Sequence, residues 1–295
     1  MDSPGLGSPI VYPDREMFAE PPLVLVAAEI RFSDAPRLRQ QETLDAVSIA
    51  FDRRFPLSGP IGGVSLVSAG PGAAPQLAQR RGVVLRNADS TEALTATPTS
   101  LTYETTDYRG FAAVRDALAD GCRTLTGLDV RPAIARIGLR YINEVRVPEA
   151  PADVSGWSHW IEPALLAPLS VTADRAVSRG IQGATLLDLG SGLLNARYAA
   201  FNDGATNVPG HLRRRPFNPG PFFGLDFDGF TEFGTNPAVL LDAGVVAEAL
   251  PVLHGAAGSV FQRSITDEAR ALFRGGGLTS LPEAAGSGPA TSPGI

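Results

Sequence analysis

The sequence predicts an α+β fold, built as a tandem duplication of a β-α-β-β(-β)-α unit with mostly antiparallel sheets and helices packed on one face. Two observations lead to this prediction. An eight-residue pattern occurs twice, at 29–36 and at 144–151, so that the two copies lie 115 residues apart. The elements expected after each copy also follow in the same order, which is a helix, hairpin strands and then a long helix.

The repeated pattern reads Glu, apolar, Arg, apolar, any residue, acid, Ala, Pro. Its first copy begins within a predicted strand over 23–32. Even-numbered residues of this strand are apolar and share one face, whereas Glu29 and Arg31 lie on the other face. A helix near 40–54 is expected next, and Pro56 stops it.

The second copy of the pattern begins within a predicted strand over 134–147. Asn143 interrupts the apolar face of this strand and would need hydrogen-bond partners if buried. The other face carries Arg140, Glu144 and Arg146. This strand therefore presents the same Glu–Arg pair as the first one, with one further arginine.

The remaining elements are predicted from hydrophobic periodicity and turn residues. They are a short strand at 64–67, hairpin strands at 81–87 and 94–105, a long helix over 111–125, a helix near 157–169, a hairpin near 180–201, a strand near 222–230 and a helical region over 240–274. Pro251 is expected to break or kink the last region, because proline lacks a backbone donor. We expect the two helix-covered sheets to join edge to edge, which hides two strand edges.

Four parts are predicted along the chain. Residues 1–20 form a flexible leader, 21–130 the first α+β repeat, 131–274 the second repeat, and 275–295 a disordered tail rich in Gly, Pro, Ser and Ala. The 295 residues are 44% hydrophobic and 19% charged. This balance supplies enough apolar surface for a sizeable core and excludes a mostly disordered protein.

Composition argues against several function classes. Acidic residues outnumber basic ones by 31 to 25, which argues against a nucleic-acid partner. The chain has no lysine, so a Schiff-base lysine and a P-loop lysine are excluded. The single cysteine, Cys122, lies in the apolar stripe of a predicted helix, which favours core packing over a nucleophilic role. No apolar run approaches the roughly 20 residues that span a bilayer, so no membrane partner is expected.

Two short motifs resemble known ligand loops, but ordinary secondary structure explains each better. Residues 186–192 resemble the glycine loop of methyltransferases, yet a returning strand follows and favours a hairpin turn. Residues 226–229 resemble the start of a calcium loop, whose required glutamate is replaced by Pro237. The three histidines and one cysteine are too widely spaced to indicate a metal site, and no cofactor is predicted.

The main candidate ligand site is the polar set on the two repeated strands. Its members are Glu29, Arg31, Arg140, Asn143, Glu144 and Arg146. If solvent meets this strand face, the pairs are ordinary cross-strand pairs of roughly 0.2–1 kcal/mol each. If helices cover it, they are buried ion pairs and a stronger site candidate. A separate candidate is Arg213–Arg215, in a loop that is either solvated or grips an anion.

Six segments together resemble a sporadically distributed, uncharacterised bacterial protein family. They are 21–23 (PPL), 29–32 (EIRF), 105–108 (TTDY), 136–143 (RIGLRYIN), 225–228 (LDFD) and 261–266 (FQRSIT). The resemblance covers nearly the whole predicted folded region. It implies a cytoplasmic bacterial protein, and it carries over no catalytic residues.

These observations favour a non-catalytic protein that binds a small molecule or another protein at the junction of the two repeats. The alternative is a metal-independent enzyme that uses Glu and Arg from the repeated strands. A raised pKa of Glu29 or Glu144 inside a cleft would be its signature. A third possibility is anion or nucleic-acid contact through Arg213–Arg215. The sequence does not predict an oligomeric state.

Overall fold

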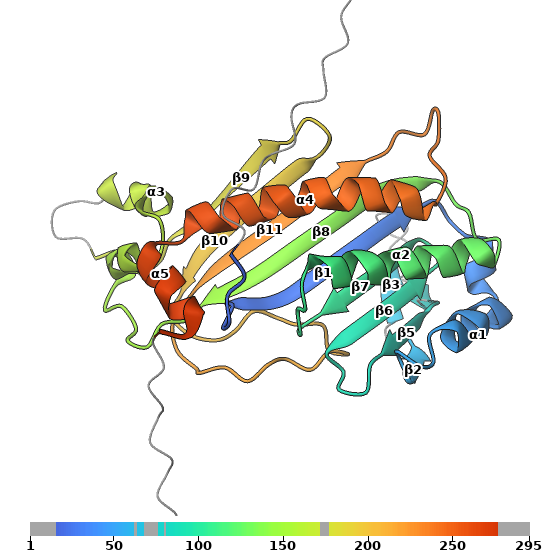
Figure 1. Ribbon diagram of the computed structural model, residues 1–295, viewed down its shortest axis with the longest axis horizontal. Helices are drawn as coiled ribbons and strands as arrows, with labels where there is room; N and C mark the ends of the chain where they lie inside the picture. Colours follow the sequence, from blue (N-terminus) through green and yellow to red (C-terminus); the bar gives the residue numbers. More distant parts are fainter. Residues whose placement is uncertain (1–15, 62–63, 68–75, 80, 172–176, 277–295) are drawn as a thin grey trace, which may run out of the picture.

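The computed structural model describes residues 16–61, 64–67, 76–79, 81–171 and 177–276. Most of the predicted leader and tail, at 1–15 and 277–295, lies outside the described residues. The predicted α+β class is confirmed. One nine-stranded antiparallel sheet carries helices α2 (Phe111–Gly127) and α4 (Ala243–Ser264) on one face (Figure 1).

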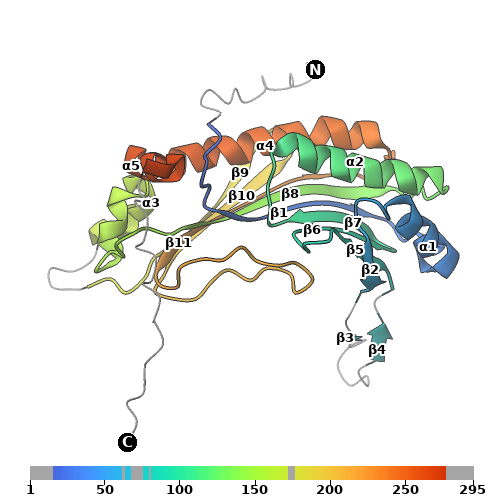
Figure 2. The same ribbon diagram turned by 60° about the horizontal axis from the view of Figure 1, so that its bottom comes forward.

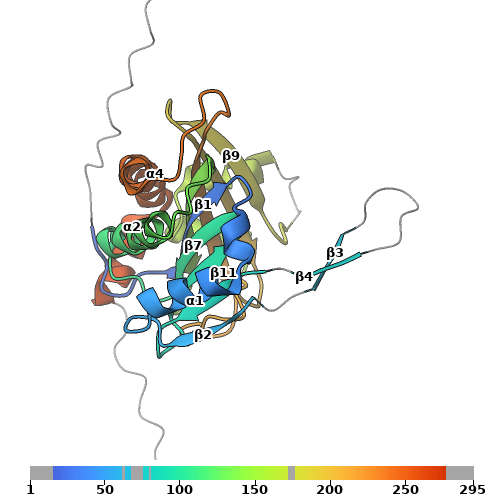
Figure 3. The same ribbon diagram turned by 90° about the vertical axis from the view of Figure 1, so that its right-hand side faces the viewer.

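The strands of the sheet follow the order β2-β5-β6-β7-β1-β8-β11-β10-β9. Their bounds are β1 Leu23–Phe32, β2 Leu57–Pro60, β5 Val83–Arg86, β6 Glu92–Thr97, β7 Ser100–Thr105, β8 Ile134–Val145, β9 Gln182–Asp188, β10 Leu193–Phe201 and β11 Phe222–Glu232. The two other strands, β3 (Val64–Val67) and β4 (Gln76–Gln79), form a hairpin that projects away from the sheet (Figure 3).

The helical elements are mostly short apart from α2 and α4. They are α1 Gln41–Ala50, α3 Pro163–Leu166, α5 Asp267–Ala271, 3-10 helices at Pro36–Arg39, Val154–His159 and Ala167–Val171, and a π-helical turn at Leu272–Gly276. The long helix predicted over 111–125 is therefore found as α2, which continues two residues further to Gly127.

The antiparallel pair of β1 and β8 forms the centre of the sheet, and Val26 lies opposite Tyr141 in this pair. The alternation of apolar and polar residues that predicted both strands produces this pairing, because each strand has one apolar face to bury. Outward from the centre, β1 is followed by β7, β6, β5 and β2, and β8 is followed by β11, β10 and β9. The pairing of β1 with β8 thus joins the strands of residues 23–105 to those of residues 134–232 within one sheet.

Helices α2 and α4 lie side by side over the apolar face of the sheet (Figures 2 and 3). The apolar stripe of α2 packs into this layer, and Cys122 within it is fully buried. From the sheet, Val26, Ile30 and Leu139 contribute fully buried side chains. This continuous core spans both predicted repeats.

Helix α4 is the one helix among the described residues whose length and apolar composition match a membrane span. Its residues Val246, Leu250 and Leu253 are fully buried and belong to the main core of the fold. The helix is therefore also explained as the core helix of this sheet.

The opposite face of the sheet is partly covered by the segment between β10 and β11, residues 202–221 (Figure 2). Leu212 of this segment packs with Leu25 and Ile142 in a second, smaller core. A loop, rather than a helix or open solvent, therefore covers part of the strand face that carries the Glu–Arg pairs.

Two expected elements are divided differently in the structure. The threonine-rich run 94–105 belongs to two strands, β6 and β7, with a tight turn at Pro98 and Thr99. Threonine favours strands on both sides of the turn, so residue type alone hides the break. The single helix expected near 157–169 is instead a series of short helical pieces, with Pro163 in the first turn of α3.

Of the two outcomes expected at Pro251, a break or a kink, the break is wrong, because α4 continues through this residue. Burial of the neighbouring Leu250 and Leu253 outweighs the missing backbone donor of the proline. The helical region breaks at Ile265, which has extended backbone angles, and the Thr266 hydroxyl then caps α5 by accepting from the Ala269 N–H.

Candidate functional site

A groove of about 370 Å³ lies on the helix-covered face of the sheet, beside the first turn of α2 and along α4. Its floor comes from β8 and β11, and the segment 16–22 before β1 forms one wall. Ring-bearing side chains dominate the lining. They are Phe18, Tyr108, Phe111, Tyr141, Phe227, His254 and Phe261.

Contacts among these rings join α2, α4 and β8 along one wall of the groove. The His254 imidazole stacks on the Phe111 ring with 4.1 Å between centroids and an interplanar angle of 4°. Tyr108 meets the Tyr141 ring edge to face at 6.0 Å. The Tyr141 hydroxyl and His254 Nδ1 lie 2.9 Å apart in a hydrogen bond that ties β8 to α4. The sequence offered no sign of this bond, since it joins residues 113 positions apart.

Asn143 is the one predicted site residue that lines this groove. Its side chain is buried, with only 4% of the residue exposed, and its Nδ2 donates to the Leu225 carbonyl at 3.2 Å. This bond fixes the orientation of the amide. Within the described part of the chain, no group donates to its Oδ1. This oxygen is not one of the buried polar atoms that lack a partner, so it is open to the groove, where a ligand N–H or O–H can take the place of water.

Gln262 on α4 is a second buried amide that lines the groove. Its Oε1 and its backbone carbonyl both accept from the Arg270 guanidinium. Its Nε2 donates to no residue in the described ranges, so the groove contains one amide donor as well as one amide acceptor. Gln262 belongs to one of the family-like segments, but residue type alone did not single it out.

Residues 16–20, the end of the predicted leader, lie against α4 and the chain beyond it. The Glu20 N–H donates to the Phe273 carbonyl at 2.9 Å, and the Phe18 ring meets the Phe273 ring edge to face at 5.5 Å. Glu16 forms an ion pair with Arg274. The hydrogen bond from Arg274 lowers the pKa of Glu16 below its ordinary value. These contacts hold the outer wall of the groove in place.

The other five predicted site residues lie on the opposite face of the sheet and do not meet Asn143. Near one end of the central pair, Glu29 accepts from Arg31 Nε at 2.7 Å and from Arg136 at 3.4 Å. The Arg31 side chain is 59% exposed. This end of the predicted polar set is therefore a partly solvated ion-pair cluster.

The other end of the set is buried beneath residues 202–221. Glu144 accepts from Arg146 Nε at 2.9 Å, from Arg214 at 2.6 Å and from the Thr206 N–H at 2.5 Å. Burial alone would raise the pKa of Glu144, but these donors outweigh burial and lower it. A lowered pKa is opposite to the signature expected for an enzyme that uses Glu144 as an acid or base.

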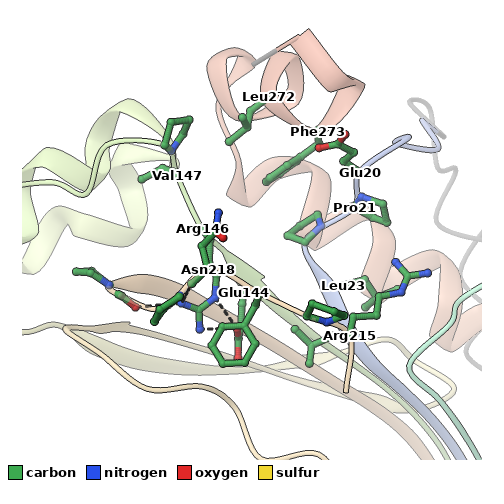
Figure 4. A pocket seen from close by; sticks show the side chains of 18 of the residues that line it. Glu20, Pro21, Leu23, Glu144, Arg146, Val147, Arg215, Asn218, Leu272 and Phe273 are labelled. Carbon is green, nitrogen blue, oxygen red and sulfur yellow. Dashed lines mark hydrogen bonds and ion pairs between the residues drawn. The ribbon is translucent and has the colours of Figure 1, made fainter. Parts of the chain in front are cut away.

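Arg146 fastens the covering loop to the sheet, beside a second cavity of about 530 Å³ (Figure 4). Its guanidinium lies 4.5 Å from the ring centroids of both Phe217 and Phe222. It also donates to the carbonyls of Gly204, Asn218 and Gly220. With Glu144 as a further acceptor, the donors of this side chain are committed to protein groups, so Arg146 acts as an anchor of the loop.

Arg140 is held in the middle of the same face. It makes a two-pronged ion pair with Asp226, at 2.7 and 2.8 Å, and these hydrogen bonds raise the pKa of Arg140. Arg197 approaches the same carboxylate at 2.9 Å. The predicted polar set is thus divided into separate ion-pair clusters, each with its own acid.

The arginines at 213–215 are also largely committed to protein groups. Arg214 pairs with Glu144, and Arg215 pairs with Asp107 at 2.6 Å. Only the exposed side chain of Arg213 makes no ion pair with a described residue. An anion would therefore meet one available guanidinium in this loop.

The remaining motifs have structural roles. Residues 186–192 form the end of β9 and the turn to β10, as the predicted hairpin requires. Residues 226–229 lie inside β11, as the strand prediction requires. Burial raises the pKa of Cys122 to about 12, which keeps its thiol protonated. Among the described residues, no group of three His, Cys, Asp or Glu side chains is arranged to hold a metal ion.

Five of the six family-like segments supply residues to the groove. Those residues are Pro21, Pro22, Leu23, Tyr108, Tyr141, Asn143, Phe227, Phe261 and Gln262. The sixth segment, 29–32, forms the end of β1. Comparisons of the chain with protein-family models and with curated proteins give no match.

Proposed function

We propose that this protein is a non-catalytic binding protein that holds a small molecule in the groove beside α2 and α4. The observation that carries the proposal is the convergence of five family-like segments, from distant parts of the chain, on one groove. Segments that share no secondary-structure element meet here. Packing alone gives no reason for these distant segments to line the same groove. A ligand that they bind together does give one.

The lining defines the ligand class. Aromatic rings favour a planar, apolar body, because ring–ring contacts add about 0.5–1.5 kcal/mol beyond the burial of area. Asn143 Oδ1 calls for a donor on the ligand, and Gln262 Nε2 calls for an acceptor. The acid and the arginine that line the groove are already paired, Glu16 with Arg274 and Arg109 with Asp107. The proposed ligand is therefore an uncharged aromatic molecule with one N–H or O–H and one acceptor.

We also propose that the chain is a tandem duplication whose two halves meet at this groove. The strand order outward from β1, through β7, β6 and β5, matches the order outward from β8, through β11, β10 and β9, and the edge strand β2 has no counterpart in the second half. The 115-residue offset maps Val26 onto Tyr141, and these residues lie opposite each other in the central pair. That coincidence is what a two-fold axis between the halves requires.

The local geometry of the repeated pattern supports the same duplication. Arg31 Nε donates to Glu29 at 2.7 Å, and Arg146 Nε donates to Glu144 at 2.9 Å, and each arginine lies two residues after its glutamate. Both pairs lie on the face opposite α2 and α4. Their surroundings differ because the long loop at 202–221 covers only the second pair, whereas β6 and β7 are joined by a tight turn.

Membership of the resembling bacterial family, and the cytoplasmic location that it implies, are part of the same proposal. The segment RIGLRYIN, at 136–143, occupies most of the central strand β8. Its alternate residues serve the groove on one face and the ion-pair clusters on the other. This double role is consistent with a segment that defines a family.

The experiment is a binding titration with N-phenyl-1-naphthylamine, an uncharged aromatic amine whose fluorescence rises in an apolar site. Its amine N–H matches Asn143 Oδ1, and it carries no acceptor for Gln262 Nε2, so it tests the aromatic lining and Asn143 alone. The proposal expects saturable binding at one site per chain. Replacing Asn143→Leu, which keeps the size and removes the acceptor, is expected to weaken binding about tenfold.

A matched pair of tryptophan variants separates the groove from the rest of the surface. Ala112→Trp places a large ring at the mouth of the groove, and Ala247→Trp places the same ring on the exposed face of α4. Only Ala112→Trp is expected to block the probe. If both variants fold and bind the probe equally well, the proposal is wrong.

A further inference from the structure

The two edges of the nine-stranded sheet differ in their protection against pairing. Exposed strand edges pair with other chains unless shortness, proline, charge or cover prevents it. The edge strand β2 has four residues and ends in Pro60, whereas the edge strand β9 has seven residues and no proline or basic residue (Figure 1). Five of the seven residues of β9 are exposed.

Backbone groups of β9 alternate between its neighbour β10 and the open edge. The Ala200 N–H donates to the Ile181 carbonyl at 2.9 Å, which places the odd-numbered residues of this segment in hydrogen-bonded pairs with β10. The even-numbered residues, Ala184 and Leu186 among them, therefore direct their N–H and C=O groups to the open edge. This edge therefore presents a regular series of outward N–H and C=O groups with which another strand can pair.

The same reasoning applied to β2 gives the opposite result. The Ile61 N–H donates to the Gly82 carbonyl at 3.3 Å, so the even-numbered residues of β2 face outward. These are Ser58 and Pro60, and proline has no N–H. Ser58 thus supplies the single outward donor of β2, which leaves this edge a poor partner for another strand.

The open edge of β9 is complementary to itself. In an antiparallel pairing centred on Thr185, Ala184 lies opposite Leu186, and Gln182 lies opposite Asp188. No charged residue meets its own copy, and two threonines meet at the centre, which is a favourable cross-strand pair. The side chain of Leu186, in a residue that is 61% exposed, would be covered in part.

We propose that two copies of this chain associate through β9, which pairs antiparallel with β9 of the second copy about a two-fold axis at Thr185. The two sheets then form one continuous sheet. Such an interface is isologous, so each hydrogen bond occurs twice. The groove beside α2 and α4 lies over the central strands and is not part of this interface, so ligand binding and association are independent.

The test is the mass of the full chain in solution, by sedimentation equilibrium from about 1 to about 300 µM. Wild type is expected to be a dimer at the upper end of this range. Ala184→Pro removes one outward N–H from each copy and leaves the bonds to β10 intact. It is expected to weaken association at least about tenfold, since two hydrogen bonds are lost per dimer.

Ser58→Pro is the matched control, because it removes an outward N–H from the opposite edge and is expected to leave the dimer unchanged. A wild-type monomer throughout the range would overturn the proposal. So would a dimer that survives Ala184→Pro with native circular dichroism. If that variant does not fold, amide exchange in wild type decides the question. The N–H groups of Ala184 and Leu186 must become slower to exchange as concentration rises.

Discussion

At the scale of single residues, Asn143 and Glu144 show how neighbours on one strand serve opposite faces. Asn143 lines the aromatic groove, and Glu144 joins an ion-pair cluster under the loop. The sequence identified both as unusual, because one is polar on an apolar face and the other repeats a pattern. The sequence did not predict their partners, the Leu225 carbonyl and the Arg214 guanidinium, since no periodicity reports which strand or loop comes to lie beside another strand.

Glu144 makes a pH-dependent contribution to stability. Its native pKa lies below the ordinary value, so the contribution is complete above the unfolded-state pKa of about 4.3 and is lost as pH falls through the lower native pKa. Glu144→Gln is expected to lower the free energy of unfolding by about 3 kcal/mol at neutral pH, because Arg146 and Arg214 lose their acid.

Urea unfolding at a series of pH values checks this prediction. The difference between wild type and Glu144→Gln is expected to shrink as pH falls below about 4. Glu149→Gln, at an exposed carboxylate, is the control and is expected to change stability little. A difference that stays constant with pH would show that the charge of Glu144 is not what stabilises the loop.

Cys122 provides a second prediction at this scale. It is fully buried in α2, and its pKa is raised to about 12. Because the thiolate is the reactive form, the native protein is expected to react with a thiol reagent only as fast as it unfolds. Labelling in native buffer and in urea, followed by mass spectrometry, measures this. Rapid labelling of the folded chain would contradict this prediction and favour a nucleophilic role for Cys122.

At the scale of elements, alternation predicted β1 and β8 well, because each buries one face of a long strand. It failed where tertiary contacts overrode local preference. Helix α4 runs through Pro251 because the residues around it are buried, and the turn at Pro98 is hidden inside a threonine-rich run. The loop at 202–221 has no periodicity at all, so nothing in the sequence showed that it covers the sheet.

The anchoring of this loop gives a prediction with a built-in control. Arg146→Ala removes bonds to three loop carbonyls and is expected to speed proteolysis within 202–221 at least about tenfold. Arg31→Ala removes the matching arginine of the first pattern, which forms no hydrogen bond or ion pair with the described residues of 202–221, and is expected to leave the rate unchanged. Mass spectrometry of the fragments locates the cuts. Equal rates in both variants would contradict the anchoring role of Arg146.

At the scale of the whole molecule, the central pair of β1 and β8 joins the two predicted repeats through a register that extends from Leu23 to Phe32. The core beneath α2 and α4 is likewise continuous. The chain is therefore expected to unfold in a single cooperative transition in differential scanning calorimetry, with equal calorimetric and van't Hoff enthalpies. Two resolved transitions would show that residues 21–130 and 131–274 behave as separate domains.

The central claim is that the aromatic groove is a ligand site, and a crystal structure of the protein with N-phenyl-1-naphthylamine tests it most directly. The account predicts that the probe lies between the rings of Tyr141 and Phe261, with its amine N–H directed at Asn143 Oδ1. A probe bound only in the cavity beside Arg146, or only on the outer surface, would contradict it.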